Sequence, residues 1–257
     1  MTDRIAAAFA SHGRQAALMP YLMGGFPDLD TSRAVGEACI DAGANLLELG
    51  VPFSDPLADG PVIHDAATRA LAAGATIHGV LRVCESLAGR VPVVLMVYAN
   101  VVLAGGDSGF VERAAAAGAA GLIVPDLPHD EAGELRAVCD SHGIALVPLA
   151  APNTPEKRLA AIAADARGFI YTVSVAGTTG ERAELPPELR ATVERVKAAA
   201  TVPVAVGFGI STPAHARQVA EIADGVIVGS RVVRAAGEGG PDAVAELVGE
   251  LAEALSY

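Results

Sequence analysis

Short apolar segments recur along the chain, and polar residues separate them at regular intervals. Each segment is six to nine residues long and apolar at almost every position, so both faces of the strand that it predicts would be buried. Strands of this kind are typical of a parallel sheet with helices on both sides. The eight segments span residues 16–24, 44–51, 91–98, 119–127, 143–150, 168–175, 201–208 and 224–229.

The stretches between these segments have helical spacing of their apolar residues, as at 30–43 and 155–166. Eight strands that alternate with helices predict one α/β domain over residues 1–257, a closed (β/α)8 barrel of the TIM type. A doubly wound open sheet is the alternative. An extra N-terminal helix is expected within the first twenty residues, with Ile5 and Phe9 on one face.

Composition narrows the function classes. Of the 257 residues 52% are hydrophobic and 19% are charged, and the formal net charge is −12. No basic run is present, so nucleic acid is not an expected partner. No apolar run reaches the ~18 residues of a membrane helix, and no signal peptide is recognisable. Three scattered cysteines (Cys39, Cys84 and Cys139) indicate reduced thiols in the cytoplasm rather than disulfides or a metal site.

Residues 48–63, ELGVPFSDPLADGPVI, place carboxylates among apolar residues without any Lys or Arg. Catalytic groups of a barrel lie at the carboxyl ends of its strands, and Glu48 lies near the end of the strand predicted at 44–51. A lone carboxyl between leucines loses hydration, which raises its pKa and suits it to general acid–base catalysis at neutral pH. The alternative is a structural glutamate that a backbone amide or a distant lysine holds.

Asp55 and Asp59 lie in the loop after this strand. Two carboxylates in different environments can divide acid and base roles between them. Both also have structural explanations, because Asp59 precedes a predicted helix that it would cap and Asp55 precedes Pro56, as turn residues do. A Gly-x-Ser-x-Gly motif is absent and no cysteine ends a strand, so a Ser or Cys nucleophile is not expected.

Glycines follow the last two predicted strands, in 206-VGFGISTP-213 and 227-IVGSRVV-233. Glycine turns at this place in a barrel, leading into helix N-termini, often bind phosphate, although ordinary turn glycines are the alternative. The predicted donors are the backbone amides of Gly209, Ile210, Gly229 and Ser230. The long Gly- and Thr-rich loop 175–188 favours a mobile lid over a substrate, with a plain connection as the alternative.

The stretch LELGVPFSDPLADGPVI closely resembles the signature of the tryptophan synthase alpha chain family. Further matching segments follow in order along the whole chain: 20-PYLMGGFPD-28, 96-MVYAN-100, 124-VPDLP-128, 171-YTVSVAGTTG-180, 207-GFGIS-211 and 228-VGS-230. The resemblance implies a TIM barrel that cleaves indole-3-glycerol phosphate to indole and glyceraldehyde 3-phosphate. Such an enzyme is a carbon–carbon lyase of tryptophan biosynthesis.

The resemblance also implies roles for individual residues. Glu48 would protonate C3 of the indole and take a proton from the glycerol hydroxyl, while Asp59 would face the indole N–H. Thr179 in the lid would hydrogen-bond Asp59. The other residues implied around the indole or the phosphate are Tyr21, Met96, Tyr98, Leu122 or its neighbours, Tyr171, Gly180, Phe208, Gly209, Ile210, Gly229 and Ser230.

A partner is implied as well: a beta chain that uses pyridoxal phosphate (PLP) to join indole to serine, in an assembly of two alpha and two beta chains. Asp55, Pro56 and Asn100 would meet that chain. No cofactor or metal is expected in this chain, which has no candidate lysine for PLP. Well-known members carry arginine in place of Val175 and phenylalanine in place of Tyr21, and 181–188 also departs from the family pattern. Lid closure is therefore expected to differ in detail, and catalysis is not.

Three other functions stay open. A phosphate-binding barrel that closes a ring usually has a lysine at a strand end, and none of the eight segments ends in one. A catalytically silent activator of a beta chain would not need both Glu48 and Asp59. A stand-alone lyase would release indole without a partner, and co-purification with a second chain would distinguish it.

Overall fold

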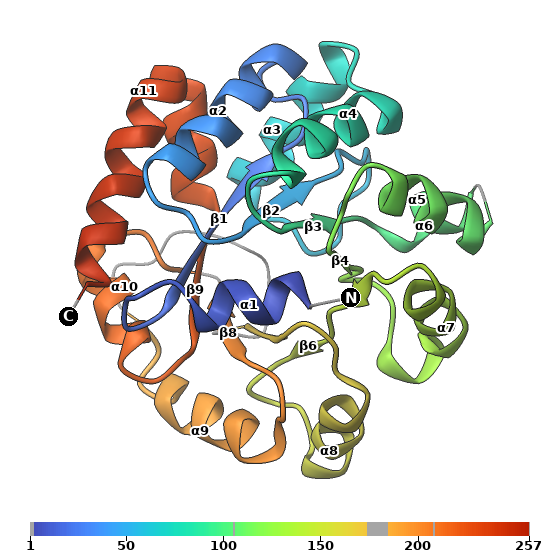
Figure 1. The fold of residues 1–257 in the computed structure, drawn as a ribbon, viewed down its shortest axis with the longest axis vertical. Helices are drawn as coiled ribbons and strands as arrows, with labels where there is room; N and C mark the ends of the chain where they lie inside the picture. Colours follow the sequence, from blue (N-terminus) through green and yellow to red (C-terminus); the bar gives the residue numbers. More distant parts are fainter. Residues whose placement is uncertain (1–2, 105, 174–184, 208, 257) are drawn as a thin grey trace.

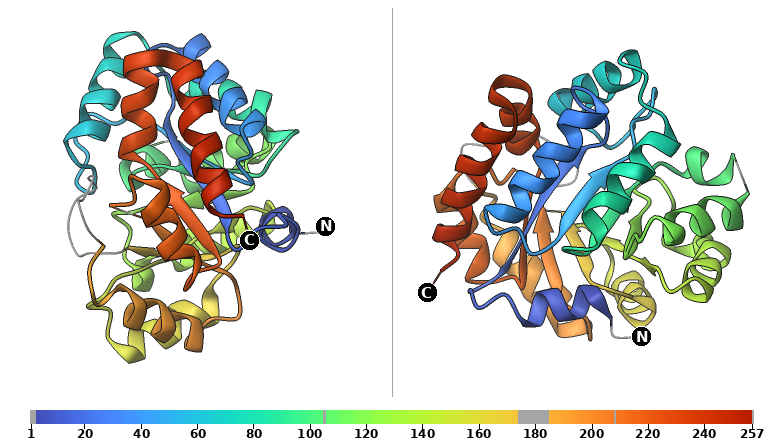
Figure 2. Two further views of the ribbon diagram at one scale, coloured as in Figure 1. Left: turned by 90° about the vertical axis from the view of Figure 1, so that its left-hand side faces the viewer. Right: turned by 45° about the horizontal axis from the view of Figure 1, so that its top comes forward.

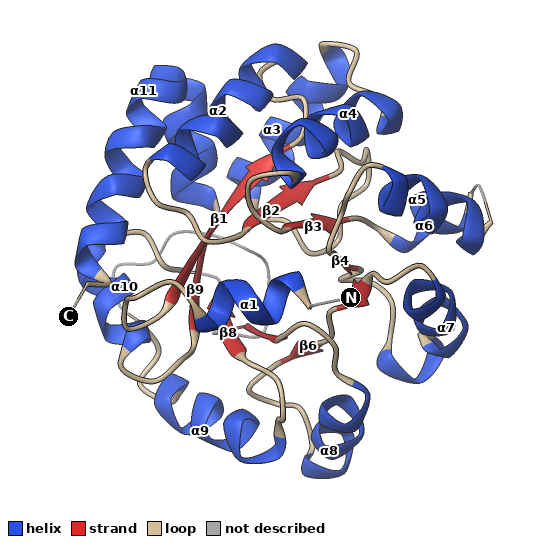
Figure 3. Ribbon diagram, in the orientation of Figure 1, coloured by secondary structure: helices blue, strands red, loops and turns tan. Residues whose placement is uncertain are grey.

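The computed structural model describes residues 3–104, 106–173, 185–207 and 209–256. Over these residues nine parallel strands form one sheet in the order β5-β4-β3-β2-β1-β9-β8-β7-β6, and helices surround it (Figures 1 and 3). The strands are β1 (Ala17–Met23), β2 (Leu47–Gly50), β3 (Val93–Met96), β4 (Gly121–Ile123), β5 (Ala145–Leu146), β6 (Leu149–Ala150), β7 (Ile170–Val173), β8 (Val204–Gly207) and β9 (Gly225–Val228). The helices are α1 (Arg4–Ala10), α2 (Leu29–Asp41), α3 (Pro61–Ala72), α4 (Ile77–Ala88), α5 (Ala99–Leu103), α6 (Asp107–Ala116), the 3-10 turn η1 (His129–Glu131), α7 (Gly133–Ser141), α8 (Glu156–Asp165), α9 (Leu189–Ala199), α10 (Pro213–Ala220) and α11 (Ser230–Ala254).

The strands at the two ends of the sheet, β5 and β6, lie on one continuous stretch of chain. β5 pairs with β4 and β6 pairs with β7, and only Val147 and Pro148 separate β5 from β6. Val147 N–H donates to the carbonyl of Leu122 at 2.8 Å, and the carbonyl of Pro148 accepts from Tyr171 N–H at 3.0 Å. The chain therefore closes the sheet into a barrel of eight strand positions, one of which β5 and β6 share.

The predicted fold class is confirmed, because every one of the eight predicted segments contains an observed strand. The segment 143–150 differs from the prediction in being split into β5 and β6. Proline has no N–H to donate to a strand ladder, so Pro148 interrupts regular pairing in the middle of this segment.

The predicted N-terminal helix is also confirmed, and it covers the amino-terminal end of the barrel. Helix α1 crosses the middle of the ring of strands in Figure 1 and lies at one end of it in Figure 2. Its Ile5 and Phe9 are buried, at 1% and 9% exposure. The Phe9 ring lies 5.5 Å from that of Phe169, while Ile5 packs against Gly121 at the start of β4. These apolar side chains form the floor of the barrel.

The helices form a nearly continuous outer layer. Most of them bury one face on the sheet, and α11 runs beside α2 (Figure 1). All three cysteines are buried, in α2, α4 and α7. Within the described residues, no helix is long and apolar enough to cross a bilayer.

Replacing Ile5 with alanine should lower the free energy of unfolding by about 2–5 kcal/mol, because it leaves a cavity above Gly121, which has no side chain of its own to fill it. The urea midpoint of the variant measures this loss. Leu103→Ala is the control, since Leu103 is 55% exposed and its truncation should change stability by about 0.5 kcal/mol or less. Equal effects of the two substitutions would show that α1 does not seal the barrel.

Candidate active site

Glu48 lies inside the barrel near the carboxyl end of β2. In the strand register it pairs with Tyr21 of β1 and Val94 of β3, so these three side chains point the same way. Its exposure is 1%, in a strand whose other residues, Leu47, Leu49 and Gly50, are buried too. The predicted strand-end carboxyl is therefore a fully buried one.

The carboxyl group of Glu48 has no protein hydrogen-bond partner at either oxygen within the described part of the chain. Burial raises its pKa from 4.5 to about 8, and the nearby carboxylate of Asp59 contributes to the rise. Glu48 is thus largely protonated at neutral pH. The alternative of a structural glutamate tied to an amide or a lysine finds no such contact here.

Asp59 lies in the loop between β2 and α3 and is half-buried. Burial raises the pKa of its carboxyl group, while a hydrogen bond from the Tyr98 hydroxyl and the neighbouring His64 oppose the rise. Asp59 does not cap α3, because the N-cap is Gly60 and makes no side-chain cap bond. The capping explanation is therefore wrong, and the carboxylate is left for other contacts.

Tyr98 connects the loop of Asp59 to the end of β3. Its hydroxyl accepts a hydrogen bond from Ala58 N–H at 3.0 Å and donates one to Asp59. Its ring stacks on Phe53 with 5.3 Å between the ring centroids. Tyr98 thereby holds the loop against the barrel mouth and supports the ionised form of Asp59.

Two further phenols lie beside the acids. Tyr21 and Tyr171 are 3% and 4% exposed, and burial together with Glu48 and Asp59 raises the pKa of both. Each hydroxyl lies over a glycine at a strand end. A Cβ at Gly50 would come within 2.1 Å of the Tyr21 hydroxyl oxygen, and a Cβ at Gly207 within 2.1 Å of that of Tyr171. The glycines make room for the phenols.

The register also places the aliphatic residues expected around an aromatic substrate. Met96 is 7% exposed and pairs with Gly50 on one side and Ile123 on the other, so these share the face of Glu48. Leu122 instead pairs with Leu95, on the opposite face. Ile123 is therefore the neighbour of Leu122 that points into the barrel.

The residues expected to bind an anion follow β8 and β9. Gly209 has a positive φ of 80°, which favours glycine, and Ile210 is buried after it. Gly229 is the N-cap of α11 and Ser230 is its first residue, 8% exposed. The first turn of a helix has unbonded N–H groups and positive partial charge, so this end of α11 suits an anion. Phe208, Thr179, Gly180 and Val175 lie outside the described residues.

The residues expected at a partner surface lie apart from the buried acids. Asp55 and Asn100 are exposed and Pro56 is half-buried. Two leucines close to them in sequence are exposed as well, Leu57 at 79% and Leu103 at 55%. The segments 54–57 and 100–103 thus present apolar side chains to solvent next to the loop that holds Asp59.

Sequence reasoning did not identify three contributors to this site. Gly50 and Gly207 accommodate the phenols, and a glycine as the last residue of a barrel strand was the available signal. His64 lies in the first turn of α3 and lowers the pKa of Asp59. Its signal was its place five residues after Asp59, on a helix that begins at the site.

The arrangement can transfer protons but offers no evident metal centre. The protonated carboxyl group of Glu48 and the half-buried carboxyl group of Asp59 lie beside the phenols of Tyr21, Tyr98 and Tyr171, and α11 begins at the same end of the barrel. In the described residues no group of three or more His, Cys, Asp or Glu side chains could hold a metal ion. Phenols and aliphatic side chains beside the two acids suit an aromatic ring, and the first turn of α11 suits an anion.

Comparisons with known proteins agree on one family. The family model described as "Tryptophan synthase alpha chain" matches residues 8–254. A tryptophan synthase alpha chain of Prochlorococcus marinus is 48% identical over 236 residues, which is 91% of this chain and 86% of that one. A solved structure of Mycobacterium tuberculosis tryptophan synthase superposes with a TM-score of 0.92 at 41% identity over 100% of both chains. A chain from the solved structure of the tryptophan synthase a2b2 complex of Pyrococcus furiosus superposes with a TM-score of 0.86 at 38% identity, over 93% of this chain and 98% of that one.

Glu48→Gln should gain stability relative to the wild-type protein as pH rises from about 5 to about 8. The folded-state pKa of Glu48, about 8, lies above the ordinary 4.5, so folding binds a proton in this window and wild-type stability falls as pH rises. Glutamine does not titrate, so the variant lacks this loss. Urea midpoints at several pH values measure the difference. Glu250→Gln, at an exposed position of α11, is the control, and a pH-independent difference for Glu48→Gln would contradict the assignment.

Proposed function

The chain belongs to the tryptophan synthase alpha chain family, and from that premise we propose that its buried acid pair cleaves indole-3-glycerol phosphate to indole and glyceraldehyde 3-phosphate. The observation that carries the proposal is the carboxyl group of Glu48, fully buried, without a hydrogen-bond partner in the described residues and with a pKa of about 8. A group of this kind holds a proton at neutral pH and can release it to a substrate. Residues 1–257 act as one domain in this proposal.

Glu48 begins the reaction as the acid. It gives its proton to C3 of the indole ring, which leaves a carboxylate on Glu48 and a positive charge delocalised toward the ring nitrogen. Asp59 is the more easily ionised acid, since Tyr98 and His64 oppose the effect of its burial. Its carboxylate faces the ring N–H and stabilises the cation, as charge placed beforehand at a developing charge does.

Glu48 then acts as the base. Its carboxylate takes the proton of the glycerol hydroxyl next to the ring while the bond between that carbon and C3 breaks. The bonding electrons return to the indole ring, the hydroxyl carbon becomes the aldehyde of glyceraldehyde 3-phosphate, and Glu48 is protonated again. The proton balance closes on one residue, and the ring itself accepts the electrons, so the chemistry asks for no cofactor or metal in this chain.

The apolar chamber would bind the indole between Tyr21, Met96, Ile123 and Tyr171, with Phe208 proposed from the resemblance. The phosphate would lie on the backbone amides of Gly209, Ile210, Gly229 and Ser230, and Gly180 and Thr179 of the 175–188 loop would complete the site. Helix α11 begins at Ser230, so its unbonded amides support an anion there. An acidic protein holds an anion in this way without a lysine or arginine.

The surface formed by Asp55, Pro56, Leu57, Asn100 and Leu103 would dock a beta chain, in an assembly of two alpha and two beta chains. Exposed leucines beside the loop of Asp59 support this, because large exposed apolar residues often mark protein interfaces. The beta chain would bind the PLP and receive the indole. Three buried cysteine thiols support a cytoplasmic location.

Glu48→Gln and Asp59→Asn should each lower kcat for indole release by about 10²-fold or more, since each removes one charge or proton that the reaction needs. The assay follows indole released from indole-3-glycerol phosphate, with and without a beta chain. Asp65→Asn is the control, because Asp65 is an exposed acid on α3 that pairs only with Arg69 at 3.9 Å. Full activity of either active-site variant would refute the mechanism. A wild-type chain that stimulates a beta chain but releases no indole would be an activator.

Leu103→Asp should raise the concentration of beta chain that gives half-maximal stimulation by about tenfold or more, while the slow release of indole by the isolated chain persists. A carboxylate at this place would be buried without a partner on docking, which costs several-fold to many-fold in affinity. Titration of beta chain against the rate of indole release measures the effect. Leu71→Asp, on α3 and 37% exposed, is the matched control. If Leu103→Asp leaves that concentration unchanged, the docking surface lies elsewhere, and if no stimulation occurs with the wild-type chain, the protein is a stand-alone lyase.

A further inference from the structure

A second cavity lies outside the barrel chamber, among the ends of β4 and β6 and the segments η1, α7 and α8. Its volume is about 280 Å³, close to the lower limit of typical small-molecule pockets. None of the acids or phenols described above lines it. The lining residues are Val124, Pro125, Leu127, Pro128, His129, Ala132, Arg136, Leu146, Val147, Pro148, Leu149, Ala150, Ala151, Thr154, Arg158, Ile162, Asp165 and Val173.

The body of this cavity is apolar and rigid. Val124, just after β4, Leu146 of β5 and Ile162 of α8 are buried and line the cavity, and three prolines lie among the other lining residues. A proline ring fixes φ, so these walls have little freedom to collapse into the space. The cavity is therefore a preformed one, and it favours a flat or compact apolar group.

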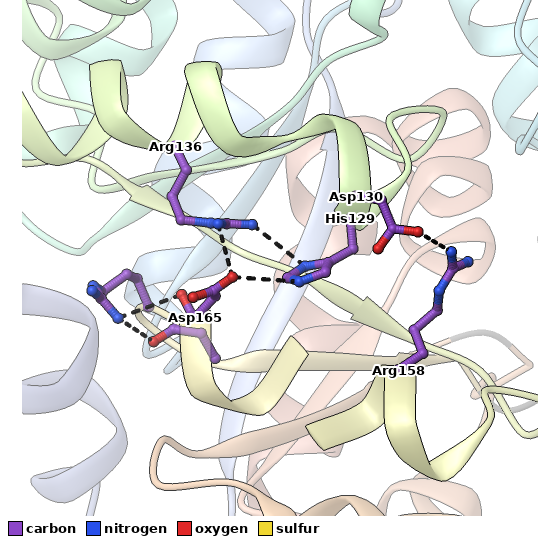
Figure 4. A network of polar contacts seen from close by, with 7 residues as sticks. His129, Asp130, Arg136, Arg158 and Asp165 are labelled. Atoms are coloured by element: carbon purple, nitrogen blue, oxygen red, sulfur yellow. Dashed lines mark hydrogen bonds and ion pairs between the residues drawn. The ribbon is translucent and has the colours of Figure 1, made fainter. Parts of the chain in front are cut away.

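Polar groups also line this space, and Figure 4 shows them as two separate sets: Arg136, His129 and Asp165 contact one another, and Arg158 contacts Asp130. Arg136 of α7 contacts Asp165 of α8 at 2.8 Å and His129 Nδ1 at 3.4 Å, while His129 Nε2 lies 3.4 Å from Asp165. A guanidinium only donates, so His129 Nδ1 is the acceptor and the ring proton is on Nε2, toward Asp165.

Both arginines have N–H groups that make no contact within the described residues. Arg136 uses one bond from each terminal nitrogen, and its side chain is only 19% exposed. Arg158, from α8, pairs with Asp130 and is 49% exposed. A guanidinium offers five N–H groups, so each arginine can also bind a ligand oxygen. Asp165 and Asp130 balance the charges of the two arginines, so a ligand oxygen would bind to the remaining N–H groups of each guanidinium.

We propose that this cavity is a binding site for a small aromatic carboxylate. The carboxylate lies between Arg136 and Arg158, and the ring system lies against Val124, Leu146 and Ile162. The site is separate from the lyase chamber and does not depend on the proposed reaction. Its ligand contacts Val173 at the end of β7, the strand that also carries Tyr171. The same strand therefore contributes to both sites.

The test uses 2-naphthoate as the probe and 2-naphthalenemethanol as its uncharged counterpart. The lyase chamber is first saturated with indole-3-propanol phosphate, an unreactive molecule that carries the ring and the phosphate of the substrate. Binding is measured by isothermal titration calorimetry, because the indole compound that blocks the other site would fluoresce together with naphthalene. We expect 2-naphthoate to bind under this condition, and the alcohol to bind at least about tenfold more weakly.

Arg136→Gln and Arg158→Gln should each weaken 2-naphthoate at least about tenfold, because each removes charge-assisted hydrogen bonds. Arg190→Gln is the matched control, since Arg190 pairs with Glu221 at 3.2 Å on α9 and does not line the cavity. Ala132→Leu narrows the cavity from its wall and should abolish binding; its thermal midpoint shows whether it folds. The probe and its alcohol test the proposal on the wild-type chain alone.

Three outcomes would overturn the proposal. Displacement of 2-naphthoate by indole-3-propanol phosphate would assign the probe to the lyase chamber. Equal binding of acid and alcohol, unchanged by both arginine substitutions, would show an apolar cavity without anion recognition. An absence of binding to the wild-type chain at the solubility limit of the probe would show that the cavity is not a site.

Discussion

The burial of one carboxyl group, that of Glu48, is the constraint on which the arrangement of the residues around it depends. A charged carboxylate without a partner is costly in an apolar interior, and the group responds by keeping its proton. Its pKa of about 8 reflects this penalty of several kcal/mol, which the large apolar core of the barrel offsets. Any hydrogen bond that stabilised the ionised form in the resting chain would lower that pKa and weaken Glu48 as an acid.

The chamber keeps this group isolated by means of packing. On the floor, Ile5 and Phe9 of α1 close the amino-terminal end of the barrel with apolar side chains. Around the acid, Tyr21 and Tyr171 fill the space above Gly50 and Gly207, so the chamber walls are rings with hydroxyl tips. A side chain at either glycine would displace a phenol. The catalytic environment therefore depends on residues that carry no chemistry of their own.

The sequence predicted the parts of the fold that depend on local pattern. Apolar runs predicted every strand segment, and the position of Glu48 at a strand end indicated it as the candidate acid. It did not predict the split of 143–150, because Pro148 interrupts pairing without changing the apolar pattern. The sequence also did not predict contacts between distant segments. Strand register decides that Ile123, and not Leu122, shares the face of Met96. The effect of His64 on the pKa of Asp59 depends on how the loop between β2 and α3 folds. The roles of Phe208, Thr179 and Gly180 stay predictions, since these residues lie outside the described part of the chain.

Acid–base asymmetry follows from where each acid sits. Glu48 is on a strand, whose register fixes it inside the barrel, whereas Asp59 is on a loop, where Tyr98 and His64 can reach it. Two carboxyl groups in one environment would compete for a single proton, and neither would have a definite role. A strand position and a loop position separate their ionisation while keeping both beside the same apolar chamber. Within the described residues neither oxygen of the Glu48 carboxyl group has a hydrogen-bond partner, and a lysine or arginine beside it would favour its ionised form and remove the acid on which the proposed reaction depends.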